Sequence, residues 1–211
     1  GINAWDKGLG VSRRDAGPSR REEEFRDSDS ADLIDGSKAE DIIDSGDGAD
    51  TVKGGMGGDQ IDTGTGDDRI DAGNDDDSVN AGSGNDSVLG GQGEDSISGG
   101  PGADEIEGGT GADRLRGGKG GDTLEGGDTL DGGSGQDLLI GGEGQDVYRL
   151  SRGDDTIQGF KENDRLSLSD ELAAEEINSE DIDIERTSIG GKKAAILSFS
   201  LKGEQHSTTI I

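Results

Sequence analysis

Apolar side chains recur every nine residues along most of the chain, each between two mostly polar neighbours. Residues 27–125 divide into eleven consecutive nine-residue units, and residues 132–167 into four more. The eighth position is apolar in all fifteen units, while its neighbours are mostly polar, as in Gln60-Ile61-Asp62. Because side chains alternate between the two faces of a strand, each triplet predicts a short strand with its central residue in the core.

The six residues before each triplet predict a turn. They are rich in Gly at positions one, two and four, as in GGMGGD (54–59) and GGTGAD (108–113). Gly adopts the positive φ angles that tight turns need and lets stacked backbones approach closely. Strand, turn, strand and turn then make an 18-residue coil, with coils about 4.8 Å apart. The pattern predicts an all-β fold, a parallel β-roll that is a right-handed, β-helix-like solenoid.

The sixth position of every unit is Asp, so a roll would stack each of these residues above the one two units earlier. Stacked carboxylates repel each other unless a counter-ion lies between them. Ca²⁺ prefers carboxylate and carbonyl oxygens, whereas Mg²⁺ demands a tight octahedron. The candidate ligands are Asp32, Asp41, Asp50, Asp59, Asp68, Asp77, Asp86, Asp95, Asp104, Asp113, Asp122, Asp137, Asp146, Asp155 and Asp164.

Composition and charge favour the same interpretation. Of 211 residues, 42 are Gly and only 26% are apolar, too few for a conventional sandwich, bundle or α/β enzyme. The formal charge of −29 disfavours nucleic acid and anionic membranes as partners and favours cations. Pairing each unit with the one two positions on allows at most about eleven Ca²⁺ ions, which would bring the charge to about −7.

The pattern G-G-x-G-x-D-x-U-x resembles the RTX (repeats-in-toxin) calcium-binding nonapeptide family. The resemblance implies that Ca²⁺ lies between adjacent turns, held by the fifteen Asp side chains and by carbonyl groups of the turn glycines. It also implies export of the unfolded chain by a type I secretion apparatus, and hence a secreted, extracellular or cell-surface location. The implied carbonyl ligands are those of Gly46, Gly48, Gly55, Gly57, Gly64, Gly66, Gly82, Gly84, Gly91, Gly93, Gly100, Gly102, Gly109, Gly111, Gly118, Gly120, Gly133, Gly135, Gly142 and Gly144.

Several units depart from the pattern. DSDSADLID (27–35) and GSKAEDIID (36–44) lack the turn glycines, and GFKENDRLS (159–167) has Phe160 and Glu162 in their place. We therefore expect weak or missing ions at both ends of the roll. The six residues GGDTLD (126–131) form a short unit, which we expect to make a local bulge and to interrupt the row of ions on one edge.

The flanks of the repeats predict separate segments. Residues 1–26 are expected to be a linker or an N-terminal cap, and their arginines Arg13, Arg14, Arg20 and Arg21 to be solvated rather than bound to an anionic polymer. Residues 168–211 predict a C-terminal cap with a short helix at 170–177 and antiparallel strands at 182–188, 192–201 and 207–211, separated by glycine turns. Solenoid ends need such covers. The resemblance implies an export signal in the same tail.

No catalytic constellation is evident in the sequence. The chain has one His (His206) and no Cys, and GGSGQ (132–136) departs from the G-x-S-x-G elbow at its last position. We therefore expect no enzyme in this chain, but a monomeric calcium-binding module at the C-terminal end of a larger secreted protein. The alternative is an extracellular binding or adhesion module that uses a flat face of the roll for polysaccharide or another surface. No stretch is apolar enough to predict a membrane span.

Overall fold

The computed structural model describes the backbone of residues 13–15, 24–26, 30–126, 129–142, 144–168, 182–189, 192–201 and 204–211. Side chains are described for residues 30–126, 129–142, 144–168 and 207–211. The described residues contain strands and turns but no helix, and so none that is long and apolar enough to cross a membrane.

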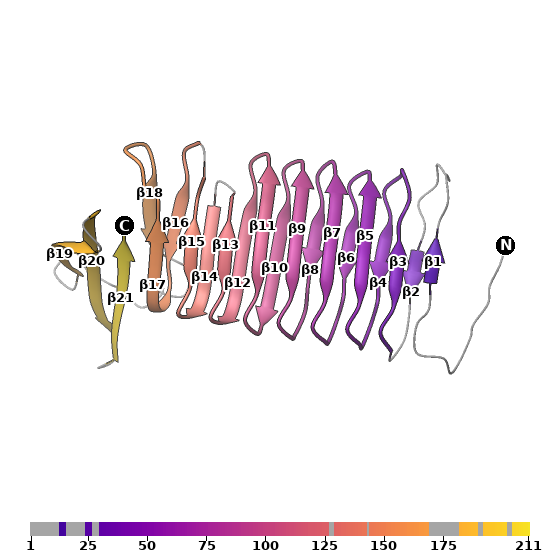
Figure 1. Ribbon diagram of the computed structural model, residues 1–211, viewed down its shortest axis with the longest axis horizontal. Helices are drawn as coiled ribbons and strands as arrows, with labels where there is room; N and C mark the ends of the chain where they lie inside the picture. The colour runs from indigo at the N-terminus through magenta and orange to yellow at the C-terminus, as the bar shows by residue number, and fades with distance from the viewer. Residues whose placement is uncertain are drawn as a thin grey trace.

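Short parallel strands form two sheets whose members alternate along the chain (Figure 1). Sheet A contains β1 (Arg13–Asp15), β3 (Leu33–Asp35), β5 (Thr51–Met56), β7 (Arg69–Asn74), β9 (Ser87–Gln92), β11 (Glu105–Thr110), β13 (Thr123–Glu125), β15 (Leu138–Ile140) and β17 (Arg152–Gln158). Sheet B contains β2 (Glu24–Arg26), β4 (Ile42–Asp44), β6 (Gln60–Asp62), β8 (Ser78–Asn80), β10 (Ser96–Pro101), β12 (Arg114–Gly120), β14 (Thr129–Gly135), β16 (Val147–Leu150) and β18 (Arg165–Leu168).

The pairing register follows the repeat. Ile61 lies beside Val79, and Val79 beside Ile97, so each strand pairs with the strand 18 residues away. The prediction of an all-β parallel solenoid built from two nonapeptides per coil is therefore confirmed. Its long axis runs across the strands (Figure 1).

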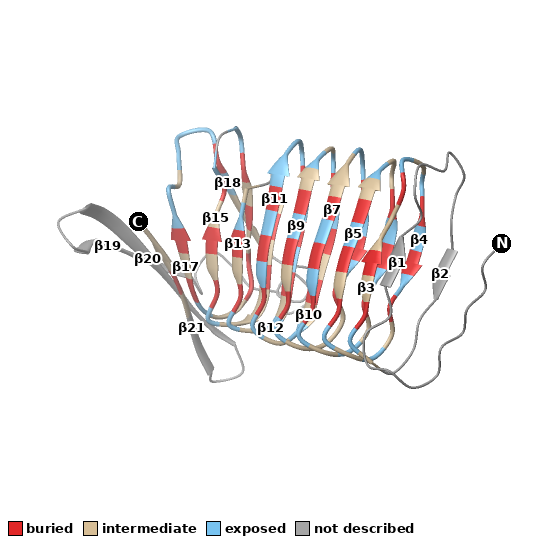
Figure 2. Ribbon diagram, turned by 45° about the vertical axis from the view of Figure 1, so that its right-hand side comes forward, coloured by how far each residue is buried: buried red, intermediate tan, exposed pale blue. Residues whose placement is uncertain are grey.

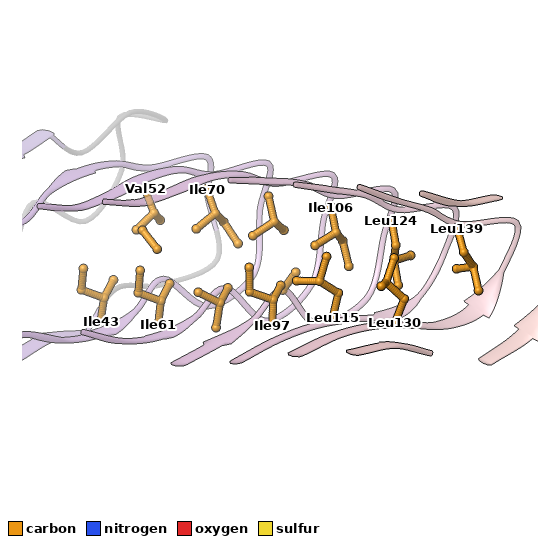
Figure 3. Packing of buried hydrophobic residues seen from close by; sticks show 14 of the residues in the cluster. Ile43, Val52, Ile61, Ile70, Ile97, Ile106, Leu115, Leu124, Leu130 and Leu139 are labelled. Atoms are coloured by element: carbon orange, nitrogen blue, oxygen red, sulfur yellow. The ribbon is translucent and has the colours of Figure 1, made fainter. Parts of the chain in front are cut away.

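The core consists of two facing rows of side chains, one from each sheet (Figure 3). Figure 2 shows buried and exposed residues alternating along the strands of sheet A. The eighth-position residues from Ile34 to Ile157 are at most 3% exposed. Because each strand contributes one such residue, a thin core suffices for a chain with few apolar residues.

The short unit leaves the strands in register. Leu115 pairs with Leu130, and Leu124 with Leu139, across a separation of 15 residues rather than 18. Leu130 is fully buried, so it occupies its place in the core. The three missing residues are therefore taken from the turn between β13 and β14, and the paired residues of these strands do not show the expected bulge.

Three antiparallel strands follow the solenoid: β19 (Ile182–Ile189), β20 (Lys192–Leu201) and β21 (Glu204–Ile210). β21 also pairs in parallel with β17, and Ile210 lies beside Ile157. The predicted C-terminal antiparallel strands are thus present and extend sheet A. The expected helix at 170–177 lies outside the described residues.

At the other end, β1 pairs with β3 and β2 pairs with β4. Both sheets therefore extend into residues 1–26, the segment that we expected to be a linker or cap. Arg13 and Arg14 belong to β1, whereas Arg20 and Arg21 lie outside the described residues.

Candidate metal-binding turns

All fifteen sixth-position Asp residues are buried, with at most 8% of their surface exposed. Each lies two residues before a core residue, so its side chain points to the same side of the backbone. They form two stacks. The first stack runs from Asp32 to Asp155 and precedes the strands of sheet A. The second runs from Asp41 to Asp164 and precedes the strands of sheet B.

One carboxylate oxygen of most stacked Asp residues accepts a main-chain hydrogen bond. In the first stack, the Asp86 amide donates to Oδ1 of Asp104 at 2.9 Å, and the Asp104 amide donates to Oδ1 of Asp122 at the same distance. In the second, the Asp77 amide donates to Oδ1 of Asp95 at 2.9 Å. These oxygens extend the sheet hydrogen bonding into the turns, a role that sequence analysis missed.

The other oxygen, Oδ2, is buried in the central turns without a hydrogen-bond partner. In turns that begin with glycine, Oδ2 faces that glycine: the Oδ2 of Asp104 lies where a Cβ on Gly99 would be. A buried carboxylate oxygen without a partner is costly, and a cation or a proton removes that cost. The residues concerned include Asp59, Asp77, Asp86, Asp95, Asp104, Asp122 and Asp137.

Burial raises the pKa of these carboxyl groups. It raises the pKa of Asp59, Asp77 and Asp86 from 3.8 to about 7, with smaller contributions from neighbouring carboxylates. The same cause raises the pKa of Asp137 to about 7 and that of Asp122 to about 6. Near neutral pH these side chains therefore need either a proton or a bound cation.

Main-chain carbonyl groups line the space between turns. All twenty glycines expected to supply carbonyl ligands have positive φ angles. The carbonyl oxygens of Gly46 and Gly48 point at the α-carbons of Gly64 and Gly66 one coil on, where a Cβ would overlap them. The described residues contain no group of three or more His, Cys, Asp or Glu side chains placed to hold a metal ion. A cation in these turns would therefore take carbonyl oxygens beside the carboxylates, a donor set that suits Ca²⁺.

Asp75 occupies a turn position that favours glycine. It is the only non-glycine among the described residues with a positive φ, 75°, and it stands where most other units have a fourth-position glycine. An L-residue pays roughly 1–2 kcal/mol in this region. Its exposed carboxylate accepts the Gly57 amide at 3.1 Å, which offsets part of that cost.

Replacing Asp75 with Gly is expected to stabilise the roll by about 1 kcal/mol, because it removes the left-handed strain. Urea unfolding at saturating Ca²⁺ measures the change. Asp76→Gly is the matched control, since Asp76 accepts the Glu94 amide at 2.8 Å but has no positive φ. That variant should lose stability. An equal loss in both variants would contradict the strain argument.

Comparison with known proteins agrees with the repeat geometry. The family model described as RTX calcium-binding nonapeptide repeat matches residues 23–52, 53–88, 89–124, 124–157 and 146–170. The chain belongs to this family. Its RTX repeats are calcium-binding repeats, and their stacked turns are where the Asp carboxylates gather.

Other comparisons add little. No curated protein matches the chain. Among solved structures, the chain is similar to the solution structure of the AlgE6R3 subunit from the Azotobacter vinelandii mannuronan C5-epimerase. The two share 19% identity over 65% of this chain and 70% of that one, with a TM-score of 0.23. At that score the likeness carries no argument about this fold.

Proposed function

We propose that this chain is a module that folds on meeting extracellular Ca²⁺ and forms the C-terminal part of a larger secreted protein. The observation that carries the proposal is the row of buried Oδ2 atoms without partners, which stack between turns lined by carbonyl oxygens. The fifteen sixth-position Asp residues and the glycine carbonyls would hold the ions. Bound Ca²⁺ would supply positive charge between carboxylates that otherwise repel each other.

The physical basis of this function is linkage between ion binding and folding. With a net charge of −29, the chain repels itself where Ca²⁺ is scarce, which keeps it extended for a type I exporter. Extracellular calcium modules have dissociation constants of about 10⁻⁴ to 10⁻³ M. Ions that bind only the folded state then drive folding by mass action. The folded module would act as a monomer outside the cell or on its surface, and catalysis would belong to the rest of the parent protein.

A far-ultraviolet circular dichroism titration with CaCl₂ tests the proposal. We expect a cooperative transition from coil to β-structure at about millimolar Ca²⁺, reversed by EGTA and absent with MgCl₂. A chain that is already fully β-structured in EGTA near neutral pH would contradict calcium-dependent folding.

Replacing a central Asp should weaken calcium binding more than replacing a terminal one. Replacing Asp86 or Asp95 with Ala is expected to raise the Ca²⁺ concentration at the folding midpoint several-fold. The reason is that each lies between two stacked turns whose carboxylates need a cation. Asp32→Ala should have a smaller effect, because its own turn lacks the glycines that supply carbonyl ligands. The midpoints of the dichroism titration give the comparison. Equal shifts in all three variants would argue against an ordered stack of ions.

A groove on the outer face of sheet B supports a second candidate function, binding of an acidic polysaccharide. Its volume is about 730 Å³, and hydroxyl, amide, arginine and aspartate side chains line it, the aspartates being Asp44, Asp62 and Asp131. Arg114 and Arg116 are exposed on β12, and Arg149 on β16 lies 3.7 Å from Asp131. The arginines of the groove gather on β12 and β16, apart from Asp44 on β4 and Asp62 on β6. This part of the groove suits carboxylate groups, which guanidinium binds with two parallel hydrogen bonds.

Affinity electrophoresis in gels containing polygalacturonate, at saturating Ca²⁺, tests this candidate. The Arg114→Gln, Arg116→Gln double variant should lose retardation, whereas Arg69→Gln, on the outer face of sheet A, should keep it. Neutral dextran is the control polymer. Retardation that is equal in wild type and double variant would contradict a role for the groove.

A further inference from the structure

Several turns near the ends of the roll satisfy their own Asp side chains. The hydroxyl of Ser37 donates to Oδ1 of Asp41 at 3.2 Å, and the Ser37 amide donates to its Oδ2 at 2.7 Å. The hydroxyl of Ser151 donates to Oδ2 of Asp155 at 3.0 Å. In these end turns, protein donors therefore reach the Asp carboxylate. In the central turns, the equivalent carboxylate keeps a buried oxygen without a partner.

The sequence cause is a substitution at the second position of the repeat. Central units have Gly there, with a positive φ and no side chain, whereas units 36–44 and 150–158 have Ser37 and Ser151. A serine hydroxyl both fills space in the turn and donates one hydrogen bond. Unit 159–167, which lacks Gly at this position, satisfies Asp164 with the Lys161 amide at 2.6 Å.

The turn at residues 141–146 is also held by protein groups. The hydroxyl of Tyr148 accepts the Gly141 amide at 2.9 Å and lies beside the Oδ2 of Asp146, both close to where a Cβ on Gly141 would be. Tyr148 is fully buried and packs on Phe160, with ring centroids 5.7 Å apart. Its hydroxyl therefore occupies turn space that aliphatic eighth-position residues leave open.

A lysine supplies positive charge to the same turn. Nζ of Lys161 donates to the carbonyl oxygen of Gly142, one of the carbonyls expected to be a calcium ligand. On the other side of this turn, the short unit (126–131) lacks three turn residues. Turn 141–146 thus has a shortened neighbour before it and an ammonium group after it.

We infer that protein groups replace calcium in these end turns. Ser37 donates to Asp41, Ser151 to Asp155 and the Lys161 amide to Asp164. Beside Asp146, the Tyr148 hydroxyl and the Lys161 ammonium occupy the turn space and the Gly142 carbonyl that an ion would use. Calcium is then confined to the central turns, where Oδ2 of Asp lacks a donor. The inference rests on the proposed function and refines it, because it states which of the fifteen aspartates bind ions. The number of bound ions falls below the ceiling of about eleven.

Native mass spectrometry of isosteric variants tests the inference by counting bound Ca²⁺. Asp95→Asn is expected to lose at least one ion, because the Oδ2 that it removes has no protein partner. Asp155→Asn should keep the wild-type count, since an amide can still pair with both Ser151 and the Asp137 amide. Far-ultraviolet dichroism confirms that both variants are folded. Equal losses would overturn the inference, whereas a wild-type chain that binds no Ca²⁺ would overturn the proposed function itself.

Ser151→Gly gives an independent gain-of-binding test. Removing the hydroxyl leaves Oδ2 of Asp155 without its donor and restores the glycine of the repeat, so the variant should bind one additional ion. Ser134→Gly, at the third position of unit 132–140, is the matched control and should bind the same number as wild type. An unchanged count in Ser151→Gly would contradict the role of this serine.

Discussion

In the absence of Ca²⁺, the chain is expected to fold at about pH 5 and to unfold as the pH rises above about 7. The cause is the buried Asp carboxyl groups, whose pKa burial raises from 3.8 to about 7 at Asp59, Asp77 and Asp86. A proton on Oδ2 removes the same buried negative charge that a cation would compensate. Acid therefore substitutes for calcium in closing the turns.

The direction of this pH dependence follows from the difference in carboxyl pKa between the folded and the unfolded chain. These carboxyl groups have a higher pKa in the folded chain than in the unfolded chain, so the folded state binds more protons. Their contribution to stability is fully present below the unfolded pKa of 3.8 and is lost as the pH rises through about 6 to 7, the folded values at Asp122 and Asp137. Stability without calcium should thus fall as the pH rises across that window. Carboxylates in salt bridges have the opposite effect, because their contribution to stability is lost as the pH falls.

Circular dichroism in EGTA, at low protein concentration because the pI is near 4.1, measures this transition. Added CaCl₂ should raise the β signal strongly at about pH 7.5 and hardly at all at about pH 5, because protons and calcium compete for the same oxygens. A chain that stays unfolded at about pH 5 would contradict the argument from buried carboxyl groups. The control is the triple variant Asp59→Asn, Asp77→Asn, Asp95→Asn. Its folding in the absence of Ca²⁺ should depend less on pH.

The nonapeptide period predicted most of the fold because each position of the unit has one physical role. An apolar eighth position, as at Ile97, can only face the core, and the 18-residue pairing follows from two turns per coil. The stacking of the aspartates followed from the same period. The structure confirmed these features.

The hydrogen bonds inside the turns were not predictable from the repeat alone. That Oδ1 of Asp104 would accept an amide from the previous coil depends on backbone orientation, which positive-φ glycines set. The roles of Ser151 and Tyr148 were also missed, because a substitution within a repeat first suggests a weakened turn. In the structure these side chains donate to, or pack beside, the carboxylate instead. For Ser151, a polar residue at a glycine position was the available signal.

Glycine at the second turn position should be essential where coils stack closely and dispensable where they do not. Gly109 and Gly142 both occupy that position, with φ angles of 101° and 89°. A Cβ on Gly109 would overlap the carbonyl oxygen of Gly91, whereas the nearest atom of the described residues to a Cβ on Gly142 is 3.8 Å away. The two sites thus share the left-handed strain and differ in the space available.

Gly142→Ala should therefore cost only the strain of a positive φ, about 1–2 kcal/mol. Gly109→Ala adds a clash with main-chain atoms, which can be relieved only by separating two coils, so it should cost more than about 4 kcal/mol or prevent folding. Calcium-saturated urea unfolding gives both values. Separating the coils also moves the Gly91 carbonyl oxygen away from the neighbouring carboxylates, so Gly109→Ala should weaken calcium binding. Gly142→Ala lies in the turn that Lys161 and Tyr148 hold, and it should leave the calcium midpoint unchanged. Equal losses of stability would show that conformational strain, and not the close approach of stacked coils, is what requires glycine in these turns.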